Sequence, residues 1–203
     1  MKILETDLVS RAAGDPTRAA TTEIALVGRS NVGKSSLINA LIRRKLARTS
    51  RAPGKTDRVN VYRVRLAIAA NRIETINLID LPGYGYARGG AKRAEAFAEV
   101  TGAYFAAQAE PRDAERPAPR VLHLVDTRHP ELDVDRDAHR WLADRGLAVL
   151  TVGTKADTLP RAERTRVAHL LEASTGGAVL LVSAKSGDGL KELWRAIVSD
   201  AAR

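Results

Sequence analysis

Residues 24–36 read Ile-Ala-Leu-Val-Gly-Arg-Ser-Asn-Val-Gly-Lys-Ser-Ser, and this stretch decides the fold. The apolar run 24–27 predicts a buried strand, and residues 36–42 predict a helix. Between them, residues 28–35 match the pattern G-x-x-x-x-G-K-[ST]. A strand, a glycine-rich loop and a helix in this order favour a phosphate-binding loop over an ordinary glycine turn before a Ser-capped helix.

The residue types at the fixed positions of this loop suit a bound phosphate. Gly28 and Gly33 allow main-chain conformations that a side chain would block. The N–H groups of the loop then converge on phosphate oxygens at the positive end of the following helix. Lys34 supplies charge to the β- and γ-phosphates, and the Ser35 hydroxyl is a ligand for Mg²⁺. The predicted nucleotide contacts in this loop are Gly28, Arg29, Ser30, Asn31, Val32, Gly33, Lys34, Ser35 and Ser36.

Length, charge and composition limit the class of protein. The chain has 203 residues, so one domain with a proper core is expected. It has no cysteine, which excludes disulfides and thiol chemistry. The start of the chain has no apolar core of signal-peptide length and no apolar run approaches the length of a membrane span, so we expect a cytoplasmic protein without a membrane partner. We also expect a monomer without a DNA partner. The formal net charge of +9 favours RNA as a further anionic partner, against the alternative of arginines spread over a solvated surface. Only two Phe, two Trp and four Tyr are present, so RNA contacts through phosphate and shape are expected rather than base stacking.

The remaining hydrophobic pattern predicts strands and helices that alternate. Strands are expected at 59–68, 73–79, 121–126, 147–152 and 178–182, and helices at 91–109, 134–145, 161–173 and 189–201. Such alternation predicts an α/β fold of the P-loop NTPase type, with a mostly parallel six-stranded sheet, one antiparallel edge strand and helices on both faces. Residues 1–22 are predicted as a partly ordered N-terminal extension with room for a short edge segment, and residues 23–203 as a single nucleotide-binding domain. Ligands of such sheets bind beyond the carboxyl ends of the strands.

Two further segments point to Mg²⁺ and the γ-phosphate. Asp80-Leu81-Pro82-Gly83 follows a predicted strand, so Asp80 is placed to hold Mg²⁺ through water and the Gly83 N–H to bond the γ-phosphate. Thr56 lies in the basic loop 46–58, where its hydroxyl can complete the Mg²⁺ shell, unless it is only one more solvated loop residue. The predicted metal ligands are therefore Ser35, Thr56 and Asp80. The predicted nucleotide contacts in these two segments are Pro53, Gly54, Lys55, Thr56, Asp80, Leu81, Pro82 and Gly83.

Two segments near the C-terminus indicate which base is bound. The Asp157 carboxylate can accept hydrogen bonds from the N1–H and the exocyclic amine of guanine, whereas adenine does not offer these donors together. Lys155 can lay its alkyl stem along the base, and the Ala184 N–H can reach guanine O6. The usual first residue of the Asp157 motif is Asn, so Thr154 is expected to give that motif weaker support. The predicted base contacts are Thr154, Lys155, Ala156, Asp157, Val182, Ser183, Ala184 and Lys185. Together these segments favour a GTPase over an ATPase or small-molecule kinase, which would have no use for Asp157 in that turn.

From about residue 23 to residue 197 the chain resembles the EngB family of translation-associated GTPases, related to Era, EngA and TrmE. The resemblance rests on residues 28–41, on Leu-Ile-Asp-Leu-Pro-Gly-Tyr-Gly-Tyr-Ala at 78–87, and on Val-Asp-Thr-Arg-His-Pro at 125–130. Thr154 is also what this family usually carries. The resemblance implies GTP and GDP binding, Mg²⁺-dependent GTP hydrolysis, and assembly of the large ribosomal subunit through its rRNA. It further implies a secondary link to cell division by septation.

The expected mechanism lacks one common part. Ras-like enzymes orient the attacking water with a Gln just after the Asp-x-x-Gly motif, and Tyr84 stands at that place. Slow intrinsic hydrolysis is therefore expected, with the Tyr84 ring pointing away. In TrmE-like relatives an Asn at the place of Asn31 helps to bind K⁺, so K⁺ is a candidate cofactor here, unless Asn31 only tightens the loop. Positioning and charge carry the rest of the catalysis, so the predicted catalytic groups are Lys34, Asn31, Thr56 and Gly83.

The histidines are not expected to take part. His123 falls in a predicted strand and is assigned to the core, and His129, His139 and His169 lack the spacing of metal ligands.

A nucleotide-dependent switch follows from Thr56 and Gly83, which both contact the γ-phosphate region in the GTP state. The loops that contain them also hold basic residues, which we expect to face ribosomal RNA: Arg48, Arg51, Lys55, Arg58, Arg88, Lys92 and Arg93. The alternative is an rRNA-binding scaffold in which the nucleotide controls binding and hydrolysis is negligible, and Tyr84 is the residue that favours it.

Overall fold

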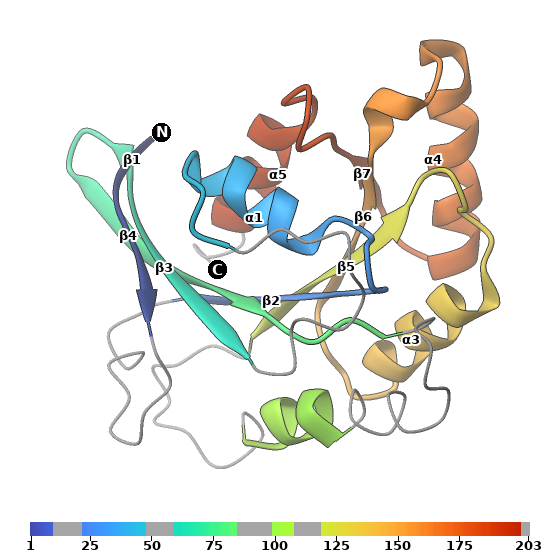
Figure 1. Cartoon of the computed structure of the whole chain (residues 1–203), viewed down its shortest axis with the longest axis horizontal. Coiled ribbons are helices and arrows are strands. Elements are labelled where there is room, and N and C mark those ends of the chain that lie inside the picture. Colours follow the sequence, from blue (N-terminus) through green and yellow to red (C-terminus); the bar gives the residue numbers. More distant parts are fainter. Residues whose placement is uncertain (10–21, 48–58, 85–98, 108–118, 200–203) are drawn as a thin grey trace.

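The computed structural model of the chain describes residues 1–9, 22–47, 59–84, 99–107 and 119–199, and these form a seven-stranded sheet with helices on both faces (Figure 1). Across the sheet the strand order is β1-β3-β4-β2-β5-β6-β7. The strands are β1 (Lys2–Val9), β2 (Thr22–Gly28), β3 (Asn60–Ala69), β4 (Arg72–Asp80), β5 (Arg120–Asp126), β6 (Val149–Thr154) and β7 (Val179–Leu181).

The sheet is parallel except at one strand. β2 pairs parallel with β4 and β5, and the parallel pairing continues through β6 to β7. β3 runs antiparallel to both of its neighbours, β1 and β4. A tight turn at Ala70 and Asn71 joins β3 to β4, as the sequence predicts.

Two details of the predicted sheet are wrong. The sheet has seven strands rather than six, because Lys2–Val9 pairs along β3. The antiparallel strand β3 is therefore internal, and β1 forms the edge in its place. The N-terminal segment joins the sheet because its main chain satisfies the outer hydrogen-bonding groups of β3, which would otherwise be an open edge.

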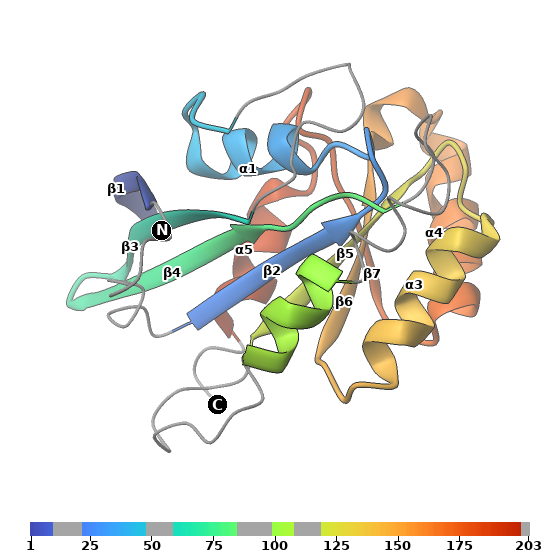
Figure 2. The same ribbon diagram turned by 60° about the horizontal axis from the view of Figure 1, so that its bottom comes forward.

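The helices cover the sheet in two layers (Figures 1 and 2). α1 (Lys34–Ile42) and α5 (Leu190–Ser199) lie on one face, where their apolar residues pack with Ile24 and Leu26 of β2. α3 (Asp133–Ala143), α4 (Arg161–Thr175) and the helix at residues 99–107 lie on the other. There Ala25 and Val27 pack with Tyr104 and Phe105, because alternate residues of a strand face opposite sides.

The helices agree with the sequence prediction within a few residues. Of the predicted helix 91–109, residues 99–107 are helical, and the rest lies outside the described part of the chain. Within the described ranges, none of the helices is both long and apolar enough to cross a membrane.

The carboxyl ends of the parallel strands place the functional segments side by side. β2 ends at Gly28, β4 at Asp80, β5 at Asp126 and β6 at Thr154. These strands are neighbours in the sheet, so the loops that follow them meet at one edge, where ligands of α/β sheets bind.

Candidate functional site

The loop between β2 and α1 has the main-chain geometry of a phosphate-binding loop. A Cβ atom on Gly28 would lie 2.8 Å from the Leu124 carbonyl oxygen and 2.9 Å from Val32 Cγ1, so no larger residue fits. Gly33 has φ +112°, which side chains rarely adopt. The first main-chain hydrogen bond of α1 runs from the Leu37 N–H to the Gly33 carbonyl at 2.8 Å. The N–H groups of the preceding turn are therefore left for an anion.

The Lys34 side chain lies under this loop. Its Nζ donates hydrogen bonds to the carbonyl oxygens of Gly28 at 3.0 Å and Arg29 at 3.4 Å. Burial lowers the pKa of Lys34, and the charge of Asp80 opposes that shift. A Cβ atom on Gly83 would lie 2.9 Å from the Lys34 Nζ. The structure thus brings Lys34, Asp80 and Gly83 together, as the sequence predicts.

Asp80 and Ser35 are the two predicted Mg²⁺ ligands that the structure describes. The Ser35 hydroxyl donates a hydrogen bond to Asp80 Oδ2 over 3.5 Å. Asp80 is only 2% exposed, and its Oδ1 has no hydrogen-bond partner among the described residues. Burial raises the pKa of Asp80 to about 6, against the charge of Lys34 and the hydrogen bond from Ser35. An unsatisfied buried carboxylate oxygen beside a hydroxyl fits a hard cation such as Mg²⁺, bound directly or through water.

Some predicted residues fall outside the described ranges. These are Pro53, Gly54, Lys55 and Thr56, with the basic residues Arg48, Arg51, Arg58, Arg88, Lys92 and Arg93. Their roles stay predictions.

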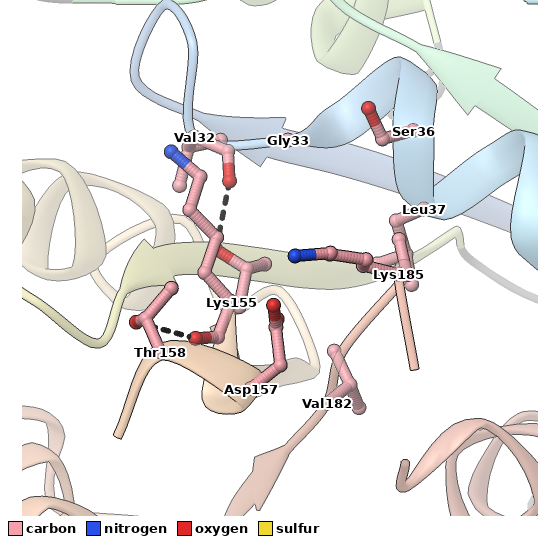
Figure 3. A pocket seen from close by; sticks show the side chains of 11 residues that line it. Val32, Gly33, Ser36, Leu37, Lys155, Asp157, Thr158, Val182 and Lys185 are labelled. Atoms are coloured by element: carbon pink, nitrogen blue, oxygen red, sulfur yellow. Dashed lines mark hydrogen bonds between the residues drawn. The ribbon is translucent and has the colours of Figure 1, made fainter. Parts of the chain in front are cut away.

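A cavity of about 300 Å³ lies where the phosphate loop meets the loops that follow β6 and β7 (Figure 3). It is lined by Val32, Gly33, Ser36, Leu37, Thr154, Lys155, Asp157, Thr158, Val182, Ala184 and Lys185. Nine of these eleven residues are predicted nucleotide contacts; the other two, Leu37 and Thr158, were missed. Leu37 could have been found from the sequence, because it lies one helical turn after Lys34. Figure 3 shows the side chains of Asp157 and Lys185 pointing into the same space.

The Asp157 carboxylate is held by the segment that follows β7. Ser183 Oγ donates a hydrogen bond of 2.6 Å to Asp157 Oδ1. The same hydroxyl oxygen accepts from the N–H groups of Lys185 at 3.1 Å and Ser186 at 3.0 Å. The Ala156 N–H also donates to the Val182 carbonyl at 3.0 Å. The two predicted base-binding segments therefore form one hydrogen-bonded unit, which turns a carboxylate toward the cavity.

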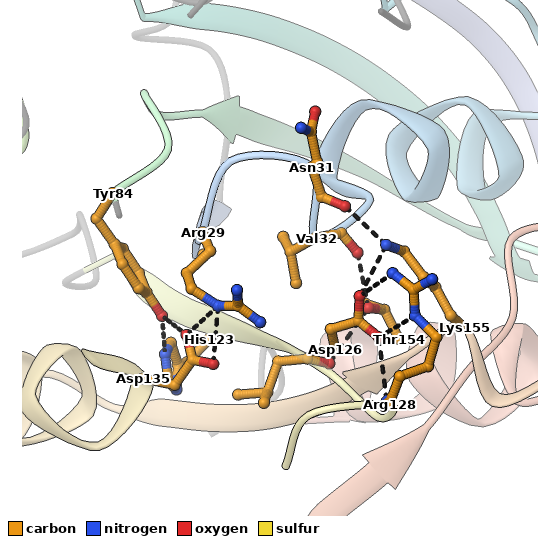
Figure 4. Close-up of polar contacts among 12 residues, drawn as sticks. Arg29, Asn31, Val32, Tyr84, His123, Asp126, Arg128, Asp135, Thr154 and Lys155 are labelled. Atoms are coloured by element: carbon orange, nitrogen blue, oxygen red, sulfur yellow. Dashed lines mark hydrogen bonds and ion pairs between the residues drawn. The ribbon is translucent and has the colours of Figure 1, made fainter. Parts of the chain in front are cut away.

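Lys155 joins this unit to the phosphate loop (Figure 4). Its main chain has φ +61°, and its Nζ donates to the Asn31 carbonyl and to Asp126 Oδ2, both at 2.8 Å. Asp126 also accepts from Arg128, with Nε to Oδ1 at 2.9 Å and an outer nitrogen to Oδ2 at 2.6 Å. Burial alone would raise the pKa of Asp126, but the hydrogen bonds from Arg128 and Lys155 outweigh it and hold that pKa well below its usual range. The sequence analysis gave no role to Asp126, which anchors Lys155, or to Arg128, which pairs with Asp126, although both lie in the 125–130 segment.

Thr154 supports the site more fully than expected from its departure from Asn. Its hydroxyl donates to two main-chain carbonyl oxygens, those of Val32 at 2.7 Å and Val125 at 3.2 Å. The residue is only 4% exposed. A threonine at the end of β6 therefore reaches the phosphate loop directly.

Some other predicted nucleotide contacts offer a ligand only their main chain, or already form hydrogen bonds within the protein. Leu81 is fully buried in the core beside Ala25, which leaves only its main chain to face a ligand. The Ser30 N–H donates to the Tyr84 carbonyl at 2.9 Å. Arg29 Nε donates to both carboxylate oxygens of Asp135, at 3.0 and 3.1 Å. The Tyr84 ring points into the core, as expected, and His123 is fully buried, in agreement with its assignment to the core.

Comparison with known proteins agrees with this geometry. The sequence profile of the 50S ribosome-binding GTPase family matches residues 23–155. The chain is 42% identical over 178 residues to a probable GTP-binding protein EngB from Solibacter usitatus, covering 87% of this chain and 85% of that protein. It is 36% identical over 182 residues to a probable GTP-binding protein EngB from Shouchella clausii, with the same coverage of 87% and 85%.

Two solved structures share the fold. A crystal structure of a probable GTP-binding protein EngB matches with a TM-score of 0.65 and 21% identity, covering 89% of this chain and 99% of that one. Era in complex with MgGDPNP and a fragment of 16S ribosomal RNA matches with a TM-score of 0.71 and 21% identity, covering 88% of this chain and 56% of that one. With the P-loop geometry, the Asp157 pocket and this extent of similarity, the chain belongs to the EngB family of GTP-binding proteins.

Proposed function

We propose that this protein binds and slowly hydrolyses GTP, and that its nucleotide state controls binding to rRNA during assembly of the large ribosomal subunit. The observation that carries the nucleotide assignment is the hydrogen bond from Ser183 to Asp157, which fixes a carboxylate at a cavity beside the phosphate loop. A fixed carboxylate selects guanine because it matches two neighbouring donors on that base. An adenine would leave the Asp157 charge without those donors, which is costly in a partly buried pocket.

The chemistry of the site is phosphoryl transfer to water. Lys34 and the N–H groups at the start of α1 stabilise negative charge on the β- and γ-phosphates. Ser35, Asp80 (through water) and the predicted ligand Thr56 would hold Mg²⁺, which would supply positive charge at the phosphate oxygens. The Gly83 N–H would donate a hydrogen bond to the γ-phosphate. Loss of that phosphate on hydrolysis removes the contact, which is the basis of the switch.

Slow hydrolysis is supported by the direction of the Tyr84 side chain. Its hydroxyl lies 2.7 Å from His123 Nε2 and donates to Asp135 Oδ1 at 2.8 Å, so it cannot also orient a water at the γ-phosphate. K⁺ beside Asn31 would supply the missing positive charge. The exposed Asn31 has φ +64°, and its carbonyl accepts the Lys155 bond, so this position also shapes the loop.

A ribosomal partner is supported by the description of the matching family, 50S ribosome-binding GTPase, and by the net charge of +9. The proposed link to cell division by septation is secondary to ribosome supply. The second candidate function, an rRNA-binding scaffold with negligible hydrolysis, is favoured by the same Tyr84 geometry.

Two measurements test the nucleotide assignment. The protein should bind GTP and GDP in the presence of Mg²⁺, and ATP should not compete. Asp157→Asn should lose affinity for guanine nucleotides and gain affinity for xanthine nucleotides, because the amide can donate where the carboxylate accepts. ATP binding as tight as GTP binding would contradict the assignment.

The partner and the reaction need separate experiments. Affinity for large-subunit precursors, measured at matched salt, should differ between a GTP analogue and GDP, and identical affinity would remove the switch. Single-turnover GTP hydrolysis with and without these particles separates the switch from the scaffold. Hydrolysis in KCl should exceed hydrolysis in NaCl, and equal rates would remove the K⁺ proposal.

A further inference from the structure

A closed ring of contacts joins the phosphate loop to Tyr84, the residue after Gly83, and Figure 4 shows its side-chain part, formed by Arg29, Asp135 and Tyr84. The Ser30 N–H donates to the Tyr84 carbonyl at 2.9 Å. The Tyr84 hydroxyl donates to Asp135 Oδ1 at 2.8 Å. Arg29 Nε donates to both oxygens of Asp135, and Arg29 precedes Ser30 in the chain, which closes the ring. The proposed phosphoryl transfer assigns no step to the side chains of Arg29, Tyr84 and Asp135.

The hydroxyl of Tyr84 has one proton, so its two contacts define the proton positions. Because that proton goes to Asp135, His123 must donate from Nε2 to the Tyr84 oxygen over 2.7 Å. His123 then has an unprotonated Nδ1, which is buried and has no hydrogen-bond partner among the described residues. Burial lowers the pKa of His123 to about 3, with a smaller contribution from His139, so the ring is neutral. The Tyr84 hydroxyl is thus held from two sides by β5 and α3.

Asp135 is itself held in place. It lies in the first turn of α3, where the helix dipole favours a carboxylate, and its side chain is only 4% exposed. Its N–H donates to the Leu132 carbonyl at 3.0 Å. Tyr84 is 5% exposed, and burial raises its pKa well above 10, so it remains a neutral donor. Such a network restricts Tyr84 to one position relative to Arg29.

Gly83 is the residue that this restriction affects. A Cβ atom on Gly83 would lie 2.9 Å from the Ser30 nitrogen and 2.9 Å from the Lys34 Nζ, so its main chain touches the phosphate loop. Consecutive Cα atoms are about 3.8 Å apart, so fixing Tyr84 leaves the Gly83 N–H little freedom. Without the ring, the Gly83 N–H would have to be ordered when the γ-phosphate binds, at an entropic cost.

We propose that Arg29, Tyr84 and Asp135 are positioning residues that hold the Gly83 main chain against the phosphate loop and thereby set the preference for GTP over GDP. This inference rests on the proposed function, since it deepens the role of Gly83. In this proposal the three side chains act through Gly83 and not by contact with the nucleotide, because the Arg29 side chain, predicted as a nucleotide contact, is engaged by Asp135 instead. GDP lacks the γ-phosphate, so its affinity depends little on where the Gly83 N–H lies.

The test measures dissociation constants for GDP and for a non-hydrolysable GTP analogue in Mg²⁺. Tyr84→Phe keeps the ring and removes the hydroxyl, and Asp135→Asn keeps the shape and removes the charge. Each variant should weaken binding of the GTP analogue about tenfold, as expected for loss of a hydrogen bond to a charged group. Each should change GDP affinity by less than about twofold. Arg29→Gln should do the same, and its combination with Tyr84→Phe should be less than additive.

Tyr104→Phe is the matched control. Its hydroxyl also donates to a buried carboxylate, Glu23 Oε2 at 3.1 Å, and its ring packs in the same core cluster as Tyr84. Its partner Glu23 lies near the start of β2, at the opposite end of that strand from the phosphate loop. Tyr104→Phe should leave the ratio of the two dissociation constants unchanged.

The outcomes separate the inference from the function on which it rests. If Tyr84→Phe and Asp135→Asn weaken GDP and the GTP analogue equally, the ring is only structural and the inference is overturned. If either variant does not fold, Arg29→Gln, at a partly exposed position, decides in its place. If the unaltered protein binds no guanine nucleotide, the proposed function fails, whatever the variants do.

Discussion

Ser183 Oγ lies 2.6 Å from Asp157 Oδ1 and donates a hydrogen bond to it across two loops that are 26 residues apart in the chain. The serine hydroxyl also accepts from two main-chain N–H groups, so it cannot rotate without losing them. Asp157, the proposed guanine-binding carboxylate, follows β6, but its orientation is therefore set by Ser183, which follows β7.

Ser183→Ala should weaken GDP and GTP alike, by about tenfold, since a hydrogen bond to a charged group contributes roughly 1.5–3 kcal/mol. Equal loss is expected because both nucleotides present the same base. Titration with a fluorescent GDP and competition by GTP measure it. Ser174→Ala is the control, because Ser174 Oγ donates only to the Leu171 carbonyl within α4. Affinities within twofold of the unaltered protein would contradict the role of Ser183.

Asp126 and Lys155 should act as one unit in nucleotide binding. Their 2.8 Å ion pair holds Lys155 over the phosphate loop, so Asp126→Asn and Lys155→Met should each weaken GDP binding. The double variant should lose less than the sum, with a coupling energy of about 1–2 kcal/mol. Additive losses would show that Asp126 acts elsewhere.

Arg128→Gln is the comparison variant for the single and double variants of Asp126 and Lys155. The Arg128 side chain is 47% exposed, so its pair with Asp126 should contribute less than about 1 kcal/mol. GDP affinity in this variant should stay close to that of the unaltered protein.

Thr154→Val should destabilise the fold, because it removes the donor to the Val32 carbonyl without changing side-chain volume. A loss of about 1–2 kcal/mol in the free energy of unfolding is expected, measured by denaturant titration. Thr154→Ser keeps the hydroxyl and should retain most of the stability. A loss in Thr154→Ser with none in Thr154→Val would mean that the Thr154 methyl group, and not its hydroxyl, is what matters.

His123 should make stability fall as the pH is lowered. Its pKa is about 3 in the folded protein and near 6.5 in the unfolded chain, so the unfolded state binds more protons between these values. The stability that His123 contributes is complete above about pH 6.5 and is lost as the pH falls toward 3, at up to about 1.4 kcal/mol per pH unit.

His123→Gln isolates this effect, since its amide can still donate to Tyr84 but does not titrate. The difference in unfolding free energy between the unaltered protein and the variant should shrink by about 2 kcal/mol from pH 6.5 to 5. The pKa of Asp80 is raised to about 6, so its contribution to the free energy of unfolding changes with pH in the opposite direction. Because Asp80 is present in both proteins, this contribution cancels when their unfolding free energies are subtracted. A difference that does not change with pH would contradict a neutral buried His123.

Much of the fold follows from local patterns in the sequence. The strand at 24–27, Gly28, Gly33 and the helix at 36–42 need only neighbouring residues to be recognised, and the structure has them where expected. The edge strand at Lys2–Val9 was underestimated, because its pairing with β3 depends on main-chain groups about 60 residues away.

The sequence by itself determined the residue types at the carboxyl ends of the strands, and with them the proposed choice of guanine through Asp157. Only the tertiary structure decided which residues orient them: Ser183 for Asp157, Asp126 for Lys155, and Asp135 with His123 for Tyr84. The physical reason is the range of the interactions. A phosphate loop is defined by main-chain conformation within a dozen residues, whereas each of these hydrogen bonds joins residues 26 to 51 positions apart and exists only when the parallel strands bring their ends together.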